Sequence, residues 1–395
     1  KGHLSAPSFR ARSVHPTPMP LRRPVLSVVV LIAAVFTGRH GELFAFTRTL
    51  TSPPANLVPL TQADWEIGAC SEFVESLITR KRHNQLTWLP SGGDALLTGH
   101  SAVLVLGDSY GDDVDMGFYC WPSQLGRRLK LPVLNVARGG SESRHIQLQL
   151  ERARNWTRGA VAVDAQTLVI VHTGGNDVLH ALRSPFMIYW LVCDLYRLYR
   201  LRQWQPAARP ELKFADEVAR FIILELKSFT ARLAAHGYRD VVISTLPIMS
   251  SLPLARLLVH VLVPTASTSF VTDSLRTIGD SINQQIFAFL PELMAEHGLR
   301  VRVFDEAAHL DLMAEEAKAS QCGVAEALRL VLRQFERIIF SGSLPEDQAG
   351  VADAGLNFWH DGHHPAVGVH KRLADEALQL VTKLDWAVVD KTLLA

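Results

Sequence analysis

The sequence predicts a doubly wound α/β fold built on a parallel sheet of five strands. Short runs rich in Val, Leu and Ile recur along the chain, and longer amphipathic segments with helical spacing lie between them. Strands that alternate with helical crossovers form a parallel sheet with helices on both faces. The expected strands are Ala102–Leu106, Pro132–Val136, Thr167–Val171, Asp240–Thr245 and Leu299–Phe304.

Three helical patterns support this alternation. The clearest covers Glu211–His236, where apolar residues recur every three to four positions and Gly237 provides the stop. A second pattern runs from about residue 269 to 297 and ends at Gly298, and a third closes the chain over about 366–384. Each is long enough to cross back over a sheet.

Composition excludes several classes of function. The chain has 395 residues, of which 48% are hydrophobic and 20% charged, and its net charge is +1. Such a balance gives no reason to expect a nucleic acid or an acidic partner. The four cysteines are widely spaced and form no CxxC pair, which argues against a zinc knuckle or a redox motif.

The N-terminal part has the character of a targeting sequence. Residues 1–23 are basic and lack Asp and Glu, and the apolar run Pro24–Phe36 follows directly. That run is shorter than the roughly 20 residues of a membrane span and fits a signal-peptide core or a short signal anchor. We expect residues 1–40 to target the chain to the secretory pathway, as a secreted or membrane-anchored protein. There are two alternatives. The apolar run could be a buried core element, or the segment could be an organelle address in which a Ser/Thr-rich transit segment follows the signal.

The remaining chain divides into two parts. Residues 41–97 are expected to form an N-terminal extension or linker with one helix over 62–82. Residues 98–395 hold the alternating strands and helices and form the expected main domain.

Polar and glycine-rich segments follow the strand ends, where open α/β sheets bind ligands. Ser109 follows the first strand at a turn, and we expect it to act as a nucleophile. A histidine must then take its proton, a carboxylate must orient that histidine, and glycine N–H groups or an asparagine amide can stabilise an oxyanion. The segments concerned are Gly107–Ser109, Asn135–Ser141, Thr173–Asp177 and Trp359–Pro365.

The spacing of Asp361 and His364 fits a carboxylate–imidazole pair. Residues three apart on a helical turn share one face, with Cβ atoms roughly 5–6 Å apart, so Asp361 can orient His364 within one turn. His363 is two residues from Asp361 and would point elsewhere, and Pro365 suits the start of the last helix.

Together these segments resemble the motifs of the SGNH, or GDSL, hydrolase superfamily of esterases and lipases, over about residues 100–385. The matching pieces are GDS at 107–109, NVARGG at 135–140, GGND at 174–177 and DGHHP at 361–365. The resemblance implies a flavodoxin-like three-layer α/β/α sandwich with a central parallel five-stranded sheet, and it implies no metal or other cofactor. It assigns Ser109 as nucleophile with Asp361 and His364 as triad partners, and it forms the oxyanion hole from the N–H groups of Ser109 and Gly140 and the amide of Asn176.

Other interpretations of the same motifs stay open. GDSYG also matches the G-x-S-x-G elbow of α/β-hydrolases, although in that fold the serine follows a late strand. The histidine cluster His360, His363 and His364 could hold a metal, but no cysteine lies nearby.

Each motif also has an ordinary structural explanation when taken alone. A serine after a strand is often a turn residue, Gly139-Gly140 would be a plain turn, and Asn176-Asp177 would be a helix cap. We expect Asp108 and Asp177 to be structural, and His172 to be a packed core residue or a support for the site.

Two apolar insertions, over residues 181–210 and 250–268, leave the sheet at its carboxyl edge. Ser184–Trp204 follows the third strand and Leu252–Pro264 follows the fourth, so both can lie over Ser109. Such covers suit a long acyl chain or contact with a membrane surface. A helical cap packed on the domain's own core is the alternative.

These observations predict a serine hydrolase that cleaves carboxylic esters through an acyl-enzyme. The expected substrates are small-molecule or lipid esters, with long acyl chains favoured by the insertions. A carbohydrate O-acetyl esterase and an acyltransferase would use the same triad and are the enzymatic alternatives. A membrane-bound or complex-bound interaction module on the same fold is the alternative without catalysis.

Overall fold

The computed structural model describes residues 85–88, 99–116, 118–156, 165–182, 184–204, 211–247, 250, 252–262, 267–317, 358–359 and 364–382. All of them belong to the unit Asn56–Ala395. The expected targeting segment, 1–40, and the helix expected over 62–82 lie outside the described residues. Within the described part of the chain, every helix is too short or too polar to span a bilayer.

A sheet with five parallel strands forms the centre of the fold, as predicted. These strands are β2 (Ala102–Gly107), β3 (Val133–Asn135), β4 (Thr167–His172), β5 (Asp240–Ser244) and β6 (Arg300–Phe304). Their spatial order is β3-β2-β4-β5-β6, and every neighbouring pair is parallel. This is the flavodoxin-like order, in which the chain starts near the middle of the sheet and builds outward in both directions. Every residue of β2, β4 and β5 is buried, which explains their nearly continuous apolar sequences.

A sixth, antiparallel strand extends the predicted parallel sheet at its edge. β1 (Gln85–Trp88) pairs antiparallel with β3 at the edge of the sheet, and its register shifts between residues 86 and 88. The sequence predicts an extension with one helix for this segment and no strand. Four residues give too short a window for an alternating pattern, and an edge strand gains its stability from the strand it joins.

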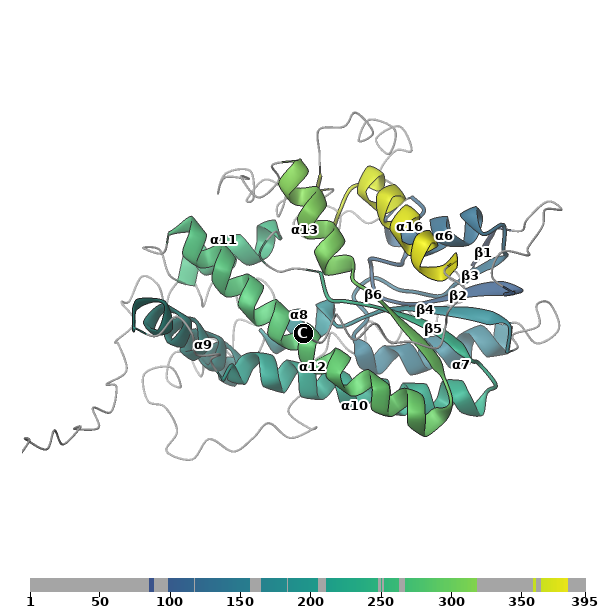
Figure 1. Cartoon of the computed structure of the whole chain (residues 1–395), viewed down its shortest axis with the longest axis horizontal. Coiled ribbons are helices and arrows are strands. Elements are labelled where there is room, and N and C mark those ends of the chain that lie inside the picture. Colours follow the sequence, from purple (N-terminus) through teal and green to yellow (C-terminus); the bar gives the residue numbers. More distant parts are fainter. Residues whose placement is uncertain are drawn as a thin grey trace, which may run out of the picture. The chain divides into compact units, whose positions relative to one another are not determined.

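Helices cover both faces of this sheet, and further helices lie at its carboxyl edge (Figure 1). One face carries α6 (Trp121–Arg128), α13 (Glu306–Glu316) and α16 (Val367–Thr382), and the other carries α7 (Ile146–Trp156), α10 (Lys213–Ala235) and α12 (Thr268–His297). At the carboxyl edge lie α8 (Gly175–Ala181), α9 (Pro185–Trp204) and α11 (Pro253–Leu262). The short elements α5 (Asp113–Met116) and η2 (Ser143–His145) complete the described helices.

Each of the two apolar insertions contains a helix, α9 in the first and α11 in the second. α9 packs against α10 and α12, and α11 packs against α12. The predicted long helices agree with α10, α12 and α16 to within two residues at each end.

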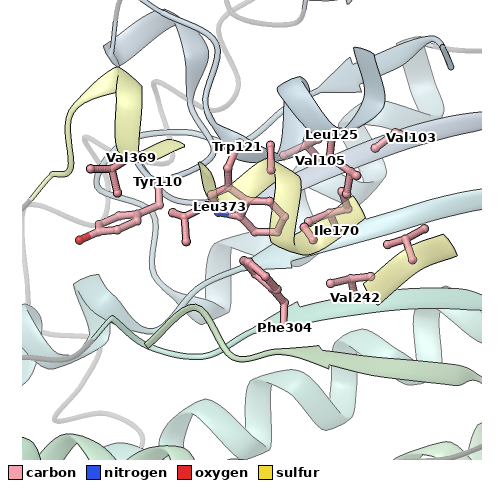
Figure 2. Packing of buried hydrophobic residues seen from close by; sticks show 14 of the residues in the cluster. Val103, Val105, Tyr110, Trp121, Leu125, Ile170, Val242, Phe304, Val369 and Leu373 are labelled. Carbon is pink, nitrogen blue, oxygen red and sulfur yellow. The ribbon is translucent and has the colours of Figure 1, made fainter. Parts of the chain in front are cut away.

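Packing on one face of the sheet fixes the C-terminal helix. Trp121 of α6 is fully buried, and its ring centroid lies 4.7 Å from that of Phe304 on β6. Val369 and Leu373 of α16 belong to the same cluster of buried side chains over the sheet (Figure 2). The Trp121 backbone N–H also donates to Nδ1 of His370 over 3.2 Å. These contacts hold the start of α16 and the residues 364–366 directly before it.

The first turn of α10 is capped by a side chain from another helix. Leu212 at the N-cap offers no side-chain acceptor, and the fully buried Asp194 of α9 accepts instead from the N–H groups of Lys213 (3.1 Å) and Phe214 (2.8 Å). We expect Asp194→Ala to lower the free energy of unfolding by about 1–3 kcal/mol, because one buried and one partly buried donor lose their acceptor. Urea denaturation measures this. The two N–H groups donate to different carboxylate oxygens, so Asp194→Asn keeps one of the two acceptors and should cost less than Asp194→Ala. Equal losses in both variants would contradict the capping role.

Candidate active site

β2 ends in a tight turn that presents Ser109 at the carboxyl edge of the sheet. The N–H of Asp108 donates to the backbone oxygen of His172 on β4 over 3.0 Å. The Asp108 carboxylate in turn accepts the N–H of Tyr110 over 3.0 Å. Ser109 is thus held between two residues whose backbone groups are fixed.

Ser109 and His364 form a buried hydrogen-bonded pair, although 255 positions separate them in the sequence. The serine Oγ lies 2.6 Å from Nε2 of the imidazole, and each residue is 5% exposed. The ring of Tyr110 lies beside the pair, with its centroid 5.7 Å from that of His364. A hydroxyl this close to an imidazole nitrogen has the geometry of a nucleophile and its general base. Asp361, expected to orient His364, lies outside the described residues.

The other two expected oxyanion groups lie just after β3 and β4. Gly140 has a left-handed backbone, with φ +80°, in the loop after β3. Asn176 lies in the first turn of α8, and its Nδ2 donates to the backbone oxygen of Ser141 over 3.0 Å. Asp112, after the Ser109 turn, accepts the N–H of Gly139 over 2.8 Å. The structure thus links the Ser109 turn, the Gly140 loop and α8 into one rim.

Two buried side chains fix this rim from below. Gln149 of α7 accepts the N–H of Gly107 (2.6 Å) and donates both to the Gly107 oxygen (2.7 Å) and to Oγ of Ser141 (3.0 Å). Asp177 of α8 accepts the N–H of Ser143 (2.9 Å) and its hydroxyl (2.6 Å). Burial, with the nearby Glu142 charge, raises the pKa of Asp177 to about 7. The contacts of Asp177 are those of a structural residue, as expected, whereas nothing in the sequence around Gln149 singled it out.

An ion cluster lies beneath the Ser109 turn. His172, expected as a packed or supporting residue, is 1% exposed and lies between the carboxylates of Asp108 and Glu306. Glu306 is not among the site residues predicted from the sequence. Its position two residues after the last parallel strand is the signal that would have found it, because all parallel strands end at the same edge of a sheet.

An apolar pocket opens beside Ser109. Asp108, Ser109, Tyr110, Gly175 and Asn176 form one part of its wall. Aliphatic side chains from α8, α9, α11, α12 and the segment after β5 form most of the rest: Val178, Leu179, Leu182, Leu191, Leu246, Pro247, Leu252, Leu254, Ala255 and Leu275. Both predicted insertions therefore contribute to the wall of a pocket that contains the serine.

The described residues offer no alternative centre based on a metal. Among them, no group of three or more His, Cys, Asp or Glu side chains is placed to hold an ion. Of the histidine cluster in the sequence, His360 and His363 lie outside the described residues, and His364 is the partner of Ser109.

Comparisons with a family model and with solved structures give matches. The model of the GDSL-like Lipase/Acylhydrolase family matches residues 103–377. Similar solved structures include a lipolytic protein of the G-D-S-L family from Veillonella parvula, with 15% identity over 72% of this chain and 99% of that chain and a TM-score of 0.35. An acetylxylan esterase from Geobacillus stearothermophilus, solved as a catalytic mutant, has 13% identity over 76% of this chain and 100% of that chain, with a TM-score of 0.35. A comparison with curated protein sequences gives no match.

Proposed function

The chain belongs to the GDSL-like lipase/acylhydrolase family, a family of ester hydrolases, and from this premise we propose that it cleaves carboxylic esters with extended apolar acyl chains. One observation carries the proposal. The buried Ser109–His364 hydrogen bond of 2.6 Å lies at a pocket whose wall is mostly aliphatic. The first feature supplies an activated hydroxyl and the second supplies a place for the acyl chain.

In the proposed reaction, His364 Nε2 takes the proton of Ser109 as its Oγ attacks the acyl carbonyl. The negative charge that develops on the carbonyl oxygen is stabilised by the N–H groups of Ser109 and Gly140 and by the Asn176 amide. His364 then gives its proton to the departing alcohol, which leaves an acyl-serine. Water attacks this ester by the same path and releases the acid. Asp361 would orient His364, a role that comes from the family motif.

The pocket supports an apolar acyl group over acetate. Leu191 of α9 and Leu254 and Ala255 of α11 line the same pocket as Ser109, so an acyl chain that extends from the serine meets side chains of both insertions. Each methylene buried there would contribute about 0.8 kcal/mol, or roughly a fourfold gain in kcat/KM. An acetyl group would leave these side chains without contact.

A chain-length series tests this proposal. With p-nitrophenyl esters from acetyl to palmitoyl, we expect kcat/KM to rise over the first several methylenes by a factor of up to about four per methylene. Ala255→Leu adds volume to the pocket wall and should move the optimum to shorter chains, while Ala235→Leu, an exposed alanine that ends α10, should leave it unchanged. Fluorophosphonate labelling reports on the serine in the same samples.

Each other outcome overturns a defined part of the proposal. Highest activity on acetyl esters would contradict the acyl pocket and favour an O-acetyl esterase. Transfer of the acyl group to an added alcohol faster than to water would favour an acyltransferase. A folded protein that neither hydrolyses any ester nor reacts with the fluorophosphonate would contradict catalysis and favour an interaction module.

A further inference from the structure

The ion cluster below Ser109 brings together side chains from four elements. Nδ1 of His172, at the end of β4, lies 2.8 Å from Oδ1 of Asp108. Its Nε2 lies 3.2 Å from Oε2 of Glu306, the first residue of α13. That Glu306 oxygen also accepts the hydroxyl of Ser244 from β5 over 2.5 Å. His172, Asp108 and Glu306 are at most 2% exposed, so solvent does not screen these charges.

The two carboxylates determine the charge of His172. A neutral imidazole has one N–H, so it can donate to only one of two facing carboxylates, whereas an imidazolium donates to both. Burial alone would lower the pKa of His172, but the Asp108 and Glu306 charges, with the hydrogen bond to Asp108, raise it to about 10. His172 is therefore a cation at neutral pH.

The His172 cation contacts a residue next to Ser109 and a ring that lies near His364. Asp108 directly precedes Ser109, and the carboxylate oxygen that binds His172 also accepts the N–H of Tyr110. The Tyr110 ring stacks on the His172 ring, with centroids 4.7 Å apart and planes within 3°. The Tyr110 ring also lies near His364, with 5.7 Å between ring centroids. One imidazolium thus supports the turn that carries the hydroxyl and the ring beside the base.

We propose that His172 is a positioning residue for the hydrolysis: its imidazolium holds the Asp108 turn and the Tyr110 ring, and it compensates the Asp108 charge beside the developing oxyanion. The inference rests on the proposed function, because it assumes that Ser109 attacks an ester. A neutral residue in this place would leave a buried carboxylate uncompensated next to an atom that becomes negative in the transition state, which raises the barrier.

The titratable groups around His172 come from each element packed against it. The groups in contact with His172 are Asp108, Tyr110 and Glu306. Three more titratable groups lie beyond these. Asp177 is close enough to Asp108 for the Asp108 charge to help raise its pKa, and His364 and His370 lie near the Tyr110 ring. Of these groups, Glu306 supports the His172 charge without lying in the Ser109 turn or in the pocket wall.

The pH profile of Glu306→Gln tests the proposal. Without the Glu306 charge, the pKa of His172 falls, so the cation is lost at lower pH and Asp108 becomes uncompensated there. We expect the alkaline limb of kcat, measured between pH 7 and 10 with buffer blanks subtracted, to move down by about 1 pH unit or more. Glu315→Gln removes an exposed carboxylate from the same helix and should leave the limb in place.

His172→Gln provides a second measurement. We expect its kcat per fluorophosphonate-labelled site to fall by roughly 10–100-fold with KM unchanged, because misplacement of the nucleophile affects the chemical step. A Glu306→Gln limb that coincides with the native limb would overturn the proposal, as would native kcat per labelled site in His172→Gln. If the native protein is active and these variants match it, this inference alone fails. If the folded native protein neither labels nor hydrolyses esters, the proposed function fails with it.

Discussion

Replacement of Ser109 by alanine is expected to lower kcat for ester hydrolysis by roughly 10⁴-fold or more while the protein stays folded. The side chain makes one described hydrogen bond, to His364, and its removal leaves only a hydroxyl-sized space beside the pocket. The turn itself is held by the backbone and carboxylate of Asp108 and does not depend on the serine hydroxyl. Activity and stability should therefore separate in this variant.

Ser281→Ala is a matched control, because this serine lies on α12 outside the pocket wall. Purified Ser109→Ala, Ser281→Ala and native protein would be compared in ester hydrolysis, fluorophosphonate labelling and thermal melting. The assignment requires that only Ser109→Ala loses hydrolysis and labelling. A Ser109→Ala protein that melts like the native one and keeps more than about a tenth of its kcat would show that another group is the nucleophile.

The sequence predicts much of this site because parallel strands all end at one edge of a sheet. Ser109, Gly140 and Asn176 each follow a different predicted strand, and the order of those strands in space brings their loops together. His364 could be placed by its motif alone, since it precedes a helix rather than following a strand. The structure adds the packing of α16 against α6, which brings His364 to Ser109.

The residues that could not be predicted from the sequence belong to no recognisable sequence motif. Gln149 lies inside an ordinary amphipathic helix, and its amide matters only because α7 crosses under Gly107. Glu306 acts through His172 on a strand two places away in the sheet, a relation that no local spacing records. β1 exists because β3 offers it a free edge. In each case a tertiary neighbour determines the role of the residue.

The second large effect is expected at Gly107, the last residue of β2, which pairs with His172 of β4. Its φ is +131°, a conformation that side chains disfavour, and a Cβ there would lie 1.8 Å from the backbone oxygen of His172. That oxygen cannot move away without loss of the hydrogen bond from the Asp108 N–H. Gly107→Ala must therefore separate two central strands or distort the turn that carries Ser109. We expect it to lower the free energy of unfolding by about 4 kcal/mol or more, or to prevent folding.

Urea denaturation followed by circular dichroism measures this cost, and Gly368→Ala is its control. Gly368 lies in the first turn of α16, has open space around its Cβ position and lacks a positive φ, so alanine should leave stability unchanged or raise it by less than about 1 kcal/mol. A Gly107→Ala protein as stable as Gly368→Ala would show that β2 and β4 can separate at their carboxyl ends at little cost. In that case the Ser109 turn would not be rigidly held, and the contacts of Asp108 and His172 could not position it.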